Sequence, residues 1–224
     1  MTTAQDRTVG VLLERYGRTY AQEAGITVKD TPSPLYQLLV LSTLLSARIS
    51  ASVAVAAAHE LFTAGYRTPR AMCSASWQQR VDALGRGHYR RYDERTATML
   101  GEGAELLTAK YRSDLRRLHD LAGSTPELIL SLQDFPGVGP VGAAIFCREV
   151  QAVWTDVAPF LDQKVADGAS RLGLPTAARE LADLVSPADL PRLAAACVRA
   201  ALEKSVADDV SALIAGDLKS TGQS

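Results

Sequence analysis

The amino-acid sequence predicts an all-α protein, and three observations support this. Apolar residues recur at helical spacing along most of the chain. Four Ser/Thr-Pro pairs each precede such a segment, which is the N-cap-then-proline signature of a helix start. No stretch alternates apolar and polar residues as a half-buried strand would, and no internal repeat is present. The four pairs are Ser33-Pro34, Thr68-Pro69, Thr125-Pro126 and Ser186-Pro187.

The first strongly apolar segment follows Ser33 and is expected to be a buried helix. Its leucines cover too wide a face for a helix with one side in water. They are Leu35, Leu38, Leu39, Leu41, Leu44 and Leu45. This segment therefore predicts a core helix around which others pack.

The remaining helices follow from apolar periodicity and from the residues that end each segment. We expect helices over residues 51–63, 77–84, 94–111, a short stretch after Ser113, and 125–132 with Thr125 as N-cap. A further helix is expected to open at Gly139. The region after Pro175 is rich in Ala and Leu and is expected to be helical, with a polar tail from Lys219. Trp77 and Trp154 are expected to be packing residues.

The composition of the chain limits its domain number, its possible ligands and its cellular compartment. A chain of 224 residues that is 47% hydrophobic can bury the core of one large domain or two small ones. The net charge is −1, so a nucleic-acid surface would have to come from local clustering of cations. Three scattered cysteines fit a reducing cytosol, and no signal peptide or membrane-length apolar run is present. We expect a cytoplasmic protein.

Residues 135–140 read Phe-Pro-Gly-Val-Gly-Pro and carry the most informative motif of the chain. Gly137 and Gly139, one residue apart, predict a tight hairpin with positive φ angles that glycine adopts most cheaply. The segment from Val141 then opens a helix, whose first amide groups and positive dipole end suit a phosphate. Helix, glycine hairpin and helix is therefore the predicted local structure.

Asp162 lies 23 positions after Gly139, within Phe-Leu-Asp-Gln-Lys-Val. A lone aspartate in front of a helical segment is ordinarily an N-cap, here for residues 163–172. The glycine hairpin upstream and the segment Arg171-Leu-Gly-Leu downstream resemble the surroundings of a catalytic aspartate in a known enzyme family, and this resemblance implies a catalytic carboxylate instead. The two roles are compatible with each other.

This ordered set resembles the helix-hairpin-helix (HhH-GPD) superfamily of base-excision DNA glycosylases related to endonuclease III. The similarity spans residues 33–175, and residues 38–48 resemble the family's first core helix, which ends in a Leu-Leu-Ser-Ala segment. The resemblance implies two helical lobes. Residues 33–137 would form a helical barrel lobe that ends in the hairpin, residues 1–32 and 138–218 a second lobe, and residues 219–224 a polar tail. The hairpin and Asp162 would then lie at the mouth of the cleft between the lobes.

The resemblance also implies roles for particular residues. Asp162 would be catalytic, stabilising the cationic sugar and orienting a water. Gly137, Val138, Gly139 and Val141 would contact DNA through the hairpin, and Arg171 would contact DNA as well. Arg48 would enter the space left by a flipped base, although an ordinary surface arginine at a helix end is an equally good interpretation. Segment 86–92 mixes cations and aromatic residues, which suits a nucleic-acid backbone, but an ordinary charged helix start explains it slightly better.

Four departures from the family pattern narrow the expected chemistry. Val141 stands where bifunctional relatives carry a Schiff-base lysine, and Lys164 does not match that position. Cys197 is the only cysteine of the C-terminal region, so the iron–sulfur cluster of many relatives is not expected. Pro140 removes one amide donor from the hairpin, and Asp167 replaces the usual arginine. We therefore expect no cofactor, apart from a monovalent cation that the hairpin backbone can accommodate.

The sequence thus predicts a monofunctional DNA glycosylase acting on double-stranded DNA that contains a lesion or mismatch. It is expected to be a monomer without membrane contact. A helix-hairpin-helix protein that binds DNA without cleaving a bond is the alternative. A helical interaction module, whose glycine turn only packs against a neighbouring helix, is a more remote one.

Overall fold

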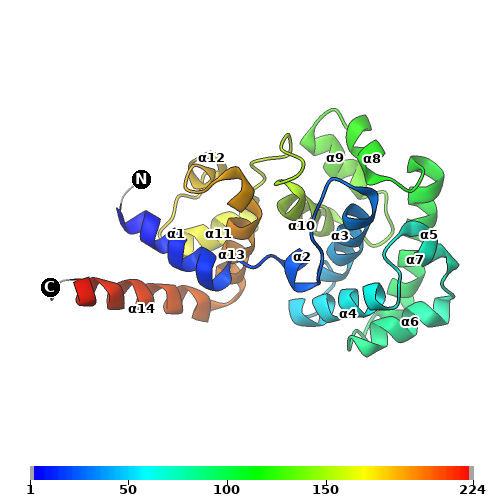
Figure 1. Ribbon diagram of the computed structural model, residues 1–224, viewed down its shortest axis with the longest axis horizontal. Coiled ribbons are helices and arrows are strands. Elements are labelled where there is room, and N and C mark those ends of the chain that lie inside the picture. Colours follow the sequence, from blue (N-terminus) through cyan, green and yellow to red (C-terminus); the bar gives the residue numbers. More distant parts are fainter. Residues whose placement is uncertain (1–2, 222–224) are drawn as a thin grey trace. The chain divides into compact units, whose positions relative to one another are not determined.

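The computed structural model describes residues 3–221, and these form helices joined by short loops, with no strand in that range (Figure 1). This confirms the all-α prediction. The described residues divide into two compact units. The central unit comprises residues 20–153, and the terminal unit comprises residues 3–19 and 154–221. Each unit is described by itself below.

The central unit contains nine helices among its described residues. They are α2 (Tyr20–Glu23), α3 (Pro32–Leu45), α4 (Ala51–Thr63), α5 (Pro69–Ser74), α6 (Trp77–Arg86), α7 (Asp93–Tyr111), α8 (Leu115–Leu121), α9 (Thr125–Leu132) and α10 (Pro140–Val150). Helix α3 is the core helix that the sequence predicts, since its leucines at 35, 38, 39, 41 and 44 are all at most 4% exposed. It contacts α4, α8 and α10, while α7 contacts α5, α6 and α8.

Of the four predicted Ser/Thr-Pro helix starts, one has the expected N-cap and three differ from the prediction. The hydroxyl of Thr68 accepts a hydrogen bond from the Ala71 amide, as expected of an N-cap before Pro69. The N-cap of α9 is Ser124 rather than Thr125, because the Ser124 hydroxyl accepts from the Glu127 amide. Thr125 is thereby the first helical residue.

Two further helix starts differ from their predicted form. Helix α3 begins two residues before Pro34, with Thr31 and not Ser33 as N-cap. Ser186 precedes a short 3-10 helix, η1 (Pro187–Asp189), and not an α-helix. Proline in both cases occupies the first turn, where its missing amide costs nothing.

The two tryptophans differ. Trp154 is 3% exposed, as expected of a packing residue. Trp77 is 41% exposed and lies in the first turn of α6, so the expectation of a core position is wrong. Its indole N–H donates to the Glu94 carbonyl and to the Thr98 hydroxyl, which explains why one edge of the ring is held against α7.

A buried carboxylate joins the two ends of the central unit. Glu149, near the end of α10, is 5% exposed and accepts hydrogen bonds from the backbone amides of Tyr20 and Ala21. These amides belong to the first turn of α2, which lies 128 residues or more away along the chain. The contact, together with the packing of α10 on α3 and α9, places residues 20–32 and 138–153 in the central unit. The boundaries expected at residues 33 and 137 therefore differ from those of the structure.

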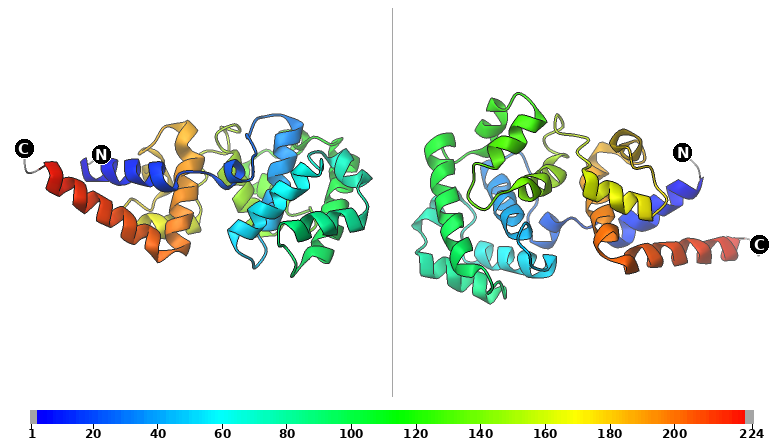
Figure 2. Two further views of the ribbon diagram at one scale, coloured as in Figure 1. Left: turned by 60° about the horizontal axis from the view of Figure 1, so that its bottom comes forward. Right: turned by 180° about the vertical axis from the view of Figure 1, so that it is seen from behind.

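The terminal unit is built around α13 (Leu190–Leu202). The other elements are α1 (Thr3–Tyr16), α11 (Gln163–Arg171), α12 (Ala178–Ala182), η1 and α14 (Lys204–Thr221). Helices α1 and α14 contact each other and α13, and they lie side by side in both figures (Figures 1 and 2). On α11, Gly168 approaches α13 so closely that an added Cβ would lie 1.8 Å from the Cys197 carbonyl oxygen.

Helix α14 extends to Thr221, so the expected polar tail is helical from residue 219 to 221, and residues 222–224 lie outside the described residues. Every helix of the described chain is too short or too polar to cross a lipid bilayer.

Candidate functional site

The hairpin between α9 and α10 is a tight turn held by its own backbone. The Val138 amide donates to the Phe135 carbonyl at 2.9 Å, and Gly137 between them has a φ of +83°. Such a φ is costly for a residue with a Cβ, so the glycine prediction holds at Gly137. The Val138 side chain is 4% exposed and anchors the turn in the central unit.

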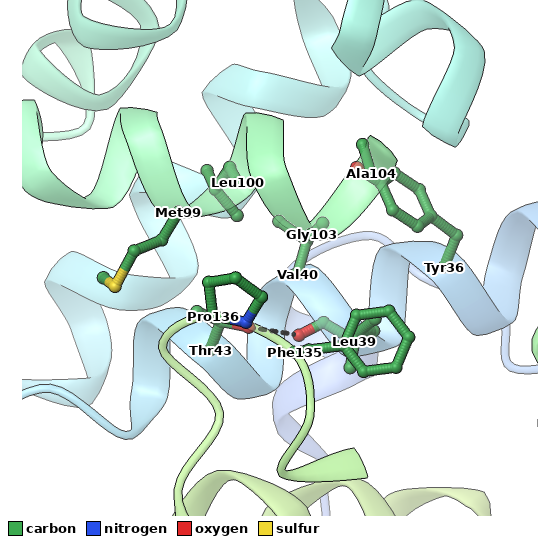
Figure 3. A pocket seen from close by; sticks show the side chains of 10 residues that line it. All are labelled: Tyr36, Leu39, Val40, Thr43, Met99, Leu100, Gly103, Ala104, Phe135 and Pro136. Atoms are coloured by element: carbon green, nitrogen blue, oxygen red, sulfur yellow. Dashed lines mark hydrogen bonds between the residues drawn. The ribbon is translucent and has the colours of Figure 1, made fainter. Parts of the chain in front are cut away.

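Gly137 is also required by the space around it. A Cβ at this position would lie 3.0 Å from the Met99 sulfur and 3.1 Å from the Thr43 methyl carbon. Met99 comes from α7 and Thr43 from α3, and the hairpin segment at Pro136 lies between these two helices (Figure 3). Two helices therefore contact the hairpin at Gly137, and a Cβ there would require Met99 and Thr43 to shift by a few tenths of an ångström.

Gly139 differs from Gly137, and here the structure corrects the sequence. It has φ −89° and ψ −171°, which most residues adopt readily, so the expected positive φ is wrong. An added Cβ would meet no atom within 4 Å. Gly139 is exposed and serves as the N-cap of α10, where its bare backbone faces open space.

The first turn of α10 leaves backbone amides without intrahelical acceptors. The Ala143 amide makes the first helical bond, to the Gly139 carbonyl at 3.0 Å. The amides of Val141 and Gly142 precede it and, by helix geometry, have no acceptor within the helix. Pro140 contributes no amide. The Val141 side chain is 61% exposed beside these groups.

The C-terminal end of α3 contacts both the hairpin and the start of α10. The Ser46 hydroxyl donates to the Thr43 carbonyl at 2.7 Å and lies 3.4 Å from the Gly137 carbonyl oxygen. A Cβ on Gly142 would come within 3.4 Å of the Ser46 Cβ, so α10 packs against α3 at this point. The hairpin and the start of α10 are thus fixed to the end of α3.

Arg48 follows this end of α3, in the loop before α4. Its side chain is exposed, and it makes no hydrogen bond or ion pair with the part of the chain that the structure describes. The structure thereby brings Arg48 and the hairpin residues into one unit, with Arg48 two residues from Ser46.

A small apolar pocket lies behind the hairpin, between α3 and α7 (Figure 3). Its volume of about 20 Å³ has room for about one water molecule. The pocket is therefore too small for a nucleobase. The Tyr36 hydroxyl on its wall is buried and has no hydrogen-bond partner among the described residues. Burial also raises the pKa of this phenol.

Asp162 lies in the terminal unit and is the N-cap of α11. Its Oδ1 accepts a hydrogen bond from the Val165 amide at 3.2 Å. The carboxylate is partly buried and sits at the positive end of the helix, where a negative charge is stabilised. The structure therefore fixes the orientation of Asp162 through the capping role that the sequence allows.

The side chain of Lys164 is engaged on the surface of α11. Its Nζ lies 3.6 Å from Asp167 Oδ2, and the two side chains are 46% and 44% exposed. The side-chain amide of Gln163 donates a hydrogen bond to the other carboxylate oxygen of Asp167, Oδ1, at 2.9 Å. An exposed pair of this kind contributes little to stability.

Arg171 lies at the other end of α11, nine residues and about 13 Å along the helix axis from Asp162. One Nη1 hydrogen is donated to the Ala200 carbonyl at 3.1 Å. The residue lines a shallow open pocket with Lys204, Ala207 and Asp208. Asp162 and Arg171 thus belong to the terminal unit, whereas Gly137, Val138, Gly139, Val141 and Arg48 belong to the central unit.

The described residues contain no group of three or more His, Cys, Asp or Glu that could hold a metal ion. Two of the three cysteines, Cys147 and Cys197, are fully buried, and burial raises the pKa of each thiol to about 12. At neutral pH these thiols are protonated and poor nucleophiles.

Sequence reasoning missed the residues that hold the hairpin in place. Met99, Thr43 and Ser46 lie tens of residues from Gly137. Thr43 and Ser46 belong to the segment 38–48 that resembles the family's first core helix, but nothing in that motif indicates a contact with the hairpin. Their role follows from the packing of α3 and α7, which periodicity alone does not specify.

Comparisons with known proteins find distant structural similarity and no match in sequence. No protein-family model matches the chain, and no curated protein matches it. Among solved structures, a trapped endonuclease III–DNA covalent intermediate with an estranged adenine is similar at 18% identity and a TM-score of 0.48. A non-covalent endonuclease III–DNA complex is similar at 19% identity and a TM-score of 0.47. Each comparison covers 89% of this chain and 86% of the other. Similarity at this level carries no argument about activity, which has to be argued from the residues.

Proposed function

We propose that the protein is a DNA glycosylase that hydrolyses the N-glycosidic bond of a damaged or mismatched base in double-stranded DNA. The observation that carries the proposal is the hairpin with its open side at Gly139. This residue exposes backbone without a side chain at the start of an eleven-residue helix. A DNA phosphate is the ligand that such a helix start recognises without reading base sequence.

The hairpin would bind the DNA backbone through amide groups and the helix dipole. The amides of Val141 and Gly142 supply donors, and the absence of a Cβ at Gly139 lets the phosphate approach closely. Pro140 supplies no donor, so this site relies on fewer amides than a helix start without proline. Arg48, exposed beside the end of α3, would occupy the space that a flipped base leaves in the duplex.

Asp162 would supply the chemistry. As the N-glycosidic bond breaks, the electron pair leaves with the base and positive charge develops at C1′ of the sugar. A fixed carboxylate stabilises this charge electrostatically. A water molecule then attacks C1′ and gives up a proton, which Asp162 can accept. The hydrogen bond from the Val165 amide orients the carboxylate before the reaction begins.

The reaction would end at base release. With Val141 at the position after Pro140, no amine there can form an imine with the sugar. No cofactor is required for hydrolysis by a carboxylate and water. We further propose that the enzyme acts as an intracellular monomer on DNA that contains a lesion or a mismatch.

The test is a panel of lesion-containing duplexes, with separate readouts for abasic-site formation and strand cleavage. The Asp162→Asn variant should lower base excision by roughly 10²-fold or more, the effect of losing one preorganised electrostatic group. Asn is as good an N-cap as Asp, so this variant should keep the stability of the parent. Asp162→Ala should lose both excision and about 1 kcal/mol of stability.

Near-parental excision by Asp162→Asn would contradict the assignment of the carboxylate. DNA binding without excision of any base in the panel would instead favour the alternative function, a helix-hairpin-helix protein that binds DNA without catalysis. Val141, Pro140 and Asp167, which depart from the family pattern, are the features that support this alternative.

Borohydride trapping on an abasic-site duplex tests the monofunctional assignment, because it converts an enzyme–DNA imine into a covalent adduct. We expect no adduct. Lys164 is the amine nearest to Asp162 in sequence, and it is paired with Asp167. A strong adduct that disappears in Lys164→Ala would show that this lysine attacks the sugar.

A further inference from the structure

Helix α7 passes directly behind the hairpin, and its N-terminal half carries an arginine to which no role has been assigned. The contact between helix and hairpin is at Met99, whose sulfur lies 3.0 Å from the position that a Cβ of Gly137 would occupy. Gly103, one turn further along α7, faces Phe135 just before the hairpin, since a Cβ added to Gly103 would lie 3.8 Å from the Phe135 ring. A stripe of α7 at residues 99 and 103 thus faces the hairpin (Figure 3).

Arg95 continues this stripe by one turn toward the start of the helix. Residues four apart lie on one face of an α-helix, so Arg95 and Met99 share a face, about 6 Å apart along the axis. Whereas Met99 is half-buried under the hairpin, Arg95 is exposed. Arg95 is therefore an exposed residue of this face, one turn before the residue that contacts the hairpin.

The Arg95 side chain makes no hydrogen bond or ion pair with any of the described residues. The acidic residues of α7 nearest to it in sequence are Asp93, Glu94 and Glu102. Glu94 lies about 100° around the helix from Arg95, and Glu102 lies two turns further along. The cation of Arg95 is therefore not neutralised by a partner on its own helix.

A second exposed arginine, Arg48, lies close in sequence to the end of α3 that supports the hairpin. It follows Ser46, which contacts both Gly137 and Gly142. Each of the two helices that contact the hairpin therefore has an exposed arginine without a hydrogen bond or ion pair among the described residues, Arg48 just after α3 and Arg95 on α7. In a chain with a net charge of −1, a nucleic-acid surface would have to come from local cations such as these.

We infer that Arg95 is a DNA-binding residue that contacts a backbone phosphate next to the phosphate bound by the hairpin. The inference rests on the proposed function, since it requires the hairpin to bind DNA. Arg95 would position the duplex through charge, without reading base sequence. Together with the amide groups of α10, it would extend the contact from one phosphate to two successive phosphates of a strand.

The experiment measures binding of a labelled, undamaged duplex to the full chain over a series of salt concentrations. Each lost phosphate contact lowers the slope of log K against log salt by about 0.9. Arg95→Ala should therefore lower the slope by about one and weaken binding roughly five- to tenfold at low salt. Arg95→Lys keeps the charge and should retain most of the affinity.

Arg117→Ala is the matched control. Arg117 is an exposed arginine of the same unit, on α8 beyond the opposite end of α7, and its loss changes the net charge equally. This variant should leave the slope unchanged. Circular dichroism melting of all variants should be unaltered, because the side chains of Arg95 and Arg117 are exposed.

The outcomes separate the inference from the function on which it rests. A parent protein that binds no DNA at low salt overturns both. A parent that binds with a salt-dependent affinity, together with an Arg95→Ala variant whose slope equals that of the parent, overturns the inference alone. Equal effects of Arg95→Ala and Arg117→Ala would also overturn it, because net charge rather than position would then explain the loss.

Discussion

The two hairpin glycines should respond in opposite ways to substitution, and this difference tests whether the hairpin binds phosphate. At Gly137, alanine has to adopt a φ of +83°, which costs about 1–2 kcal/mol for an L-residue. Its Cβ also presses on Met99 and Thr43 at 3.0–3.1 Å, and crowding of this kind costs about 1–3 kcal/mol. Gly137→Ala should therefore lower the free energy of unfolding by about 2–5 kcal/mol.

At Gly139 the same change should be nearly neutral for stability. The φ of −89° suits alanine, and its Cβ would meet no atom within 4 Å. Loss of glycine as N-cap and the lower entropy of the unfolded chain are opposing effects of a few tenths of a kcal/mol to about 1 kcal/mol each. Gly139→Ala and Gly139→Val should therefore fold as the parent does.

DNA binding should nevertheless fall in the Gly139 variants, and more for valine than for alanine. The added side chain fills the space through which a phosphate would approach the amides of α10. Loss of one hydrogen-bonded contact to a charged group corresponds to about 1.5–3 kcal/mol, or about tenfold or more in affinity. Urea unfolding measures the stability, and fluorescence anisotropy with a duplex measures the binding. A Gly139→Val variant that folds and binds DNA as tightly as the parent would refute the phosphate role.

Two further predictions concern the terminal unit and the thiols. Gly168→Ala should lower the free energy of unfolding by about 4 kcal/mol or more, because the Cβ would overlap the Cys197 carbonyl at 1.8 Å. Thermal melting beside Gly10→Ala, where a Cβ meets no atom within 4 Å, checks this, and equal melting temperatures would contradict it. In the native protein at pH 8, only the exposed Cys73 should react with a thiol reagent, and all three cysteines should react in urea. Because burial raises the pKa of Cys147 and Cys197 to about 12, raising the pH to 9 should add no second native thiol, and a fast second thiol would show that one of these sites is open.

The sequence predicts the helices well because their signals are local. The bounds of α4 at Ala51 and Thr63 agree with the prediction, since Ser50 caps its start and Gly65 ends the segment. The positive φ of Gly137 is likewise predictable, because a glycine that follows a proline in a tight turn commonly adopts this conformation. The N-cap of α9 shifts by one residue because Ser124 and Thr125 are both competent caps, and sequence alone does not decide between them.

The parts that could not be predicted depend on contacts between distant segments. Gly139 has an extended backbone because it is the N-cap of α10, and the exposed position of Trp77 goes with its hydrogen bonds to Glu94 and Thr98 of α7. The role inferred for Arg95 requires knowing that α7 passes behind the hairpin. Assignment of Asp162, Arg48 and Arg171 to a DNA site stays a prediction from the motif and its resemblance.

The division of the chain has a consequence for biosynthesis. Helix α1 buries Val9 and Leu12 in a unit whose other helices follow residue 153. At about 5–20 residues per second, its partners leave the ribosome on the order of ten seconds after it. The central unit, by contrast, is contiguous, and Glu149 joins its last helix to its first residues as soon as both are made. The unit with the hairpin can therefore fold during translation. The apolar face of α1, by contrast, stays unpacked until α13 and α14 have been synthesised.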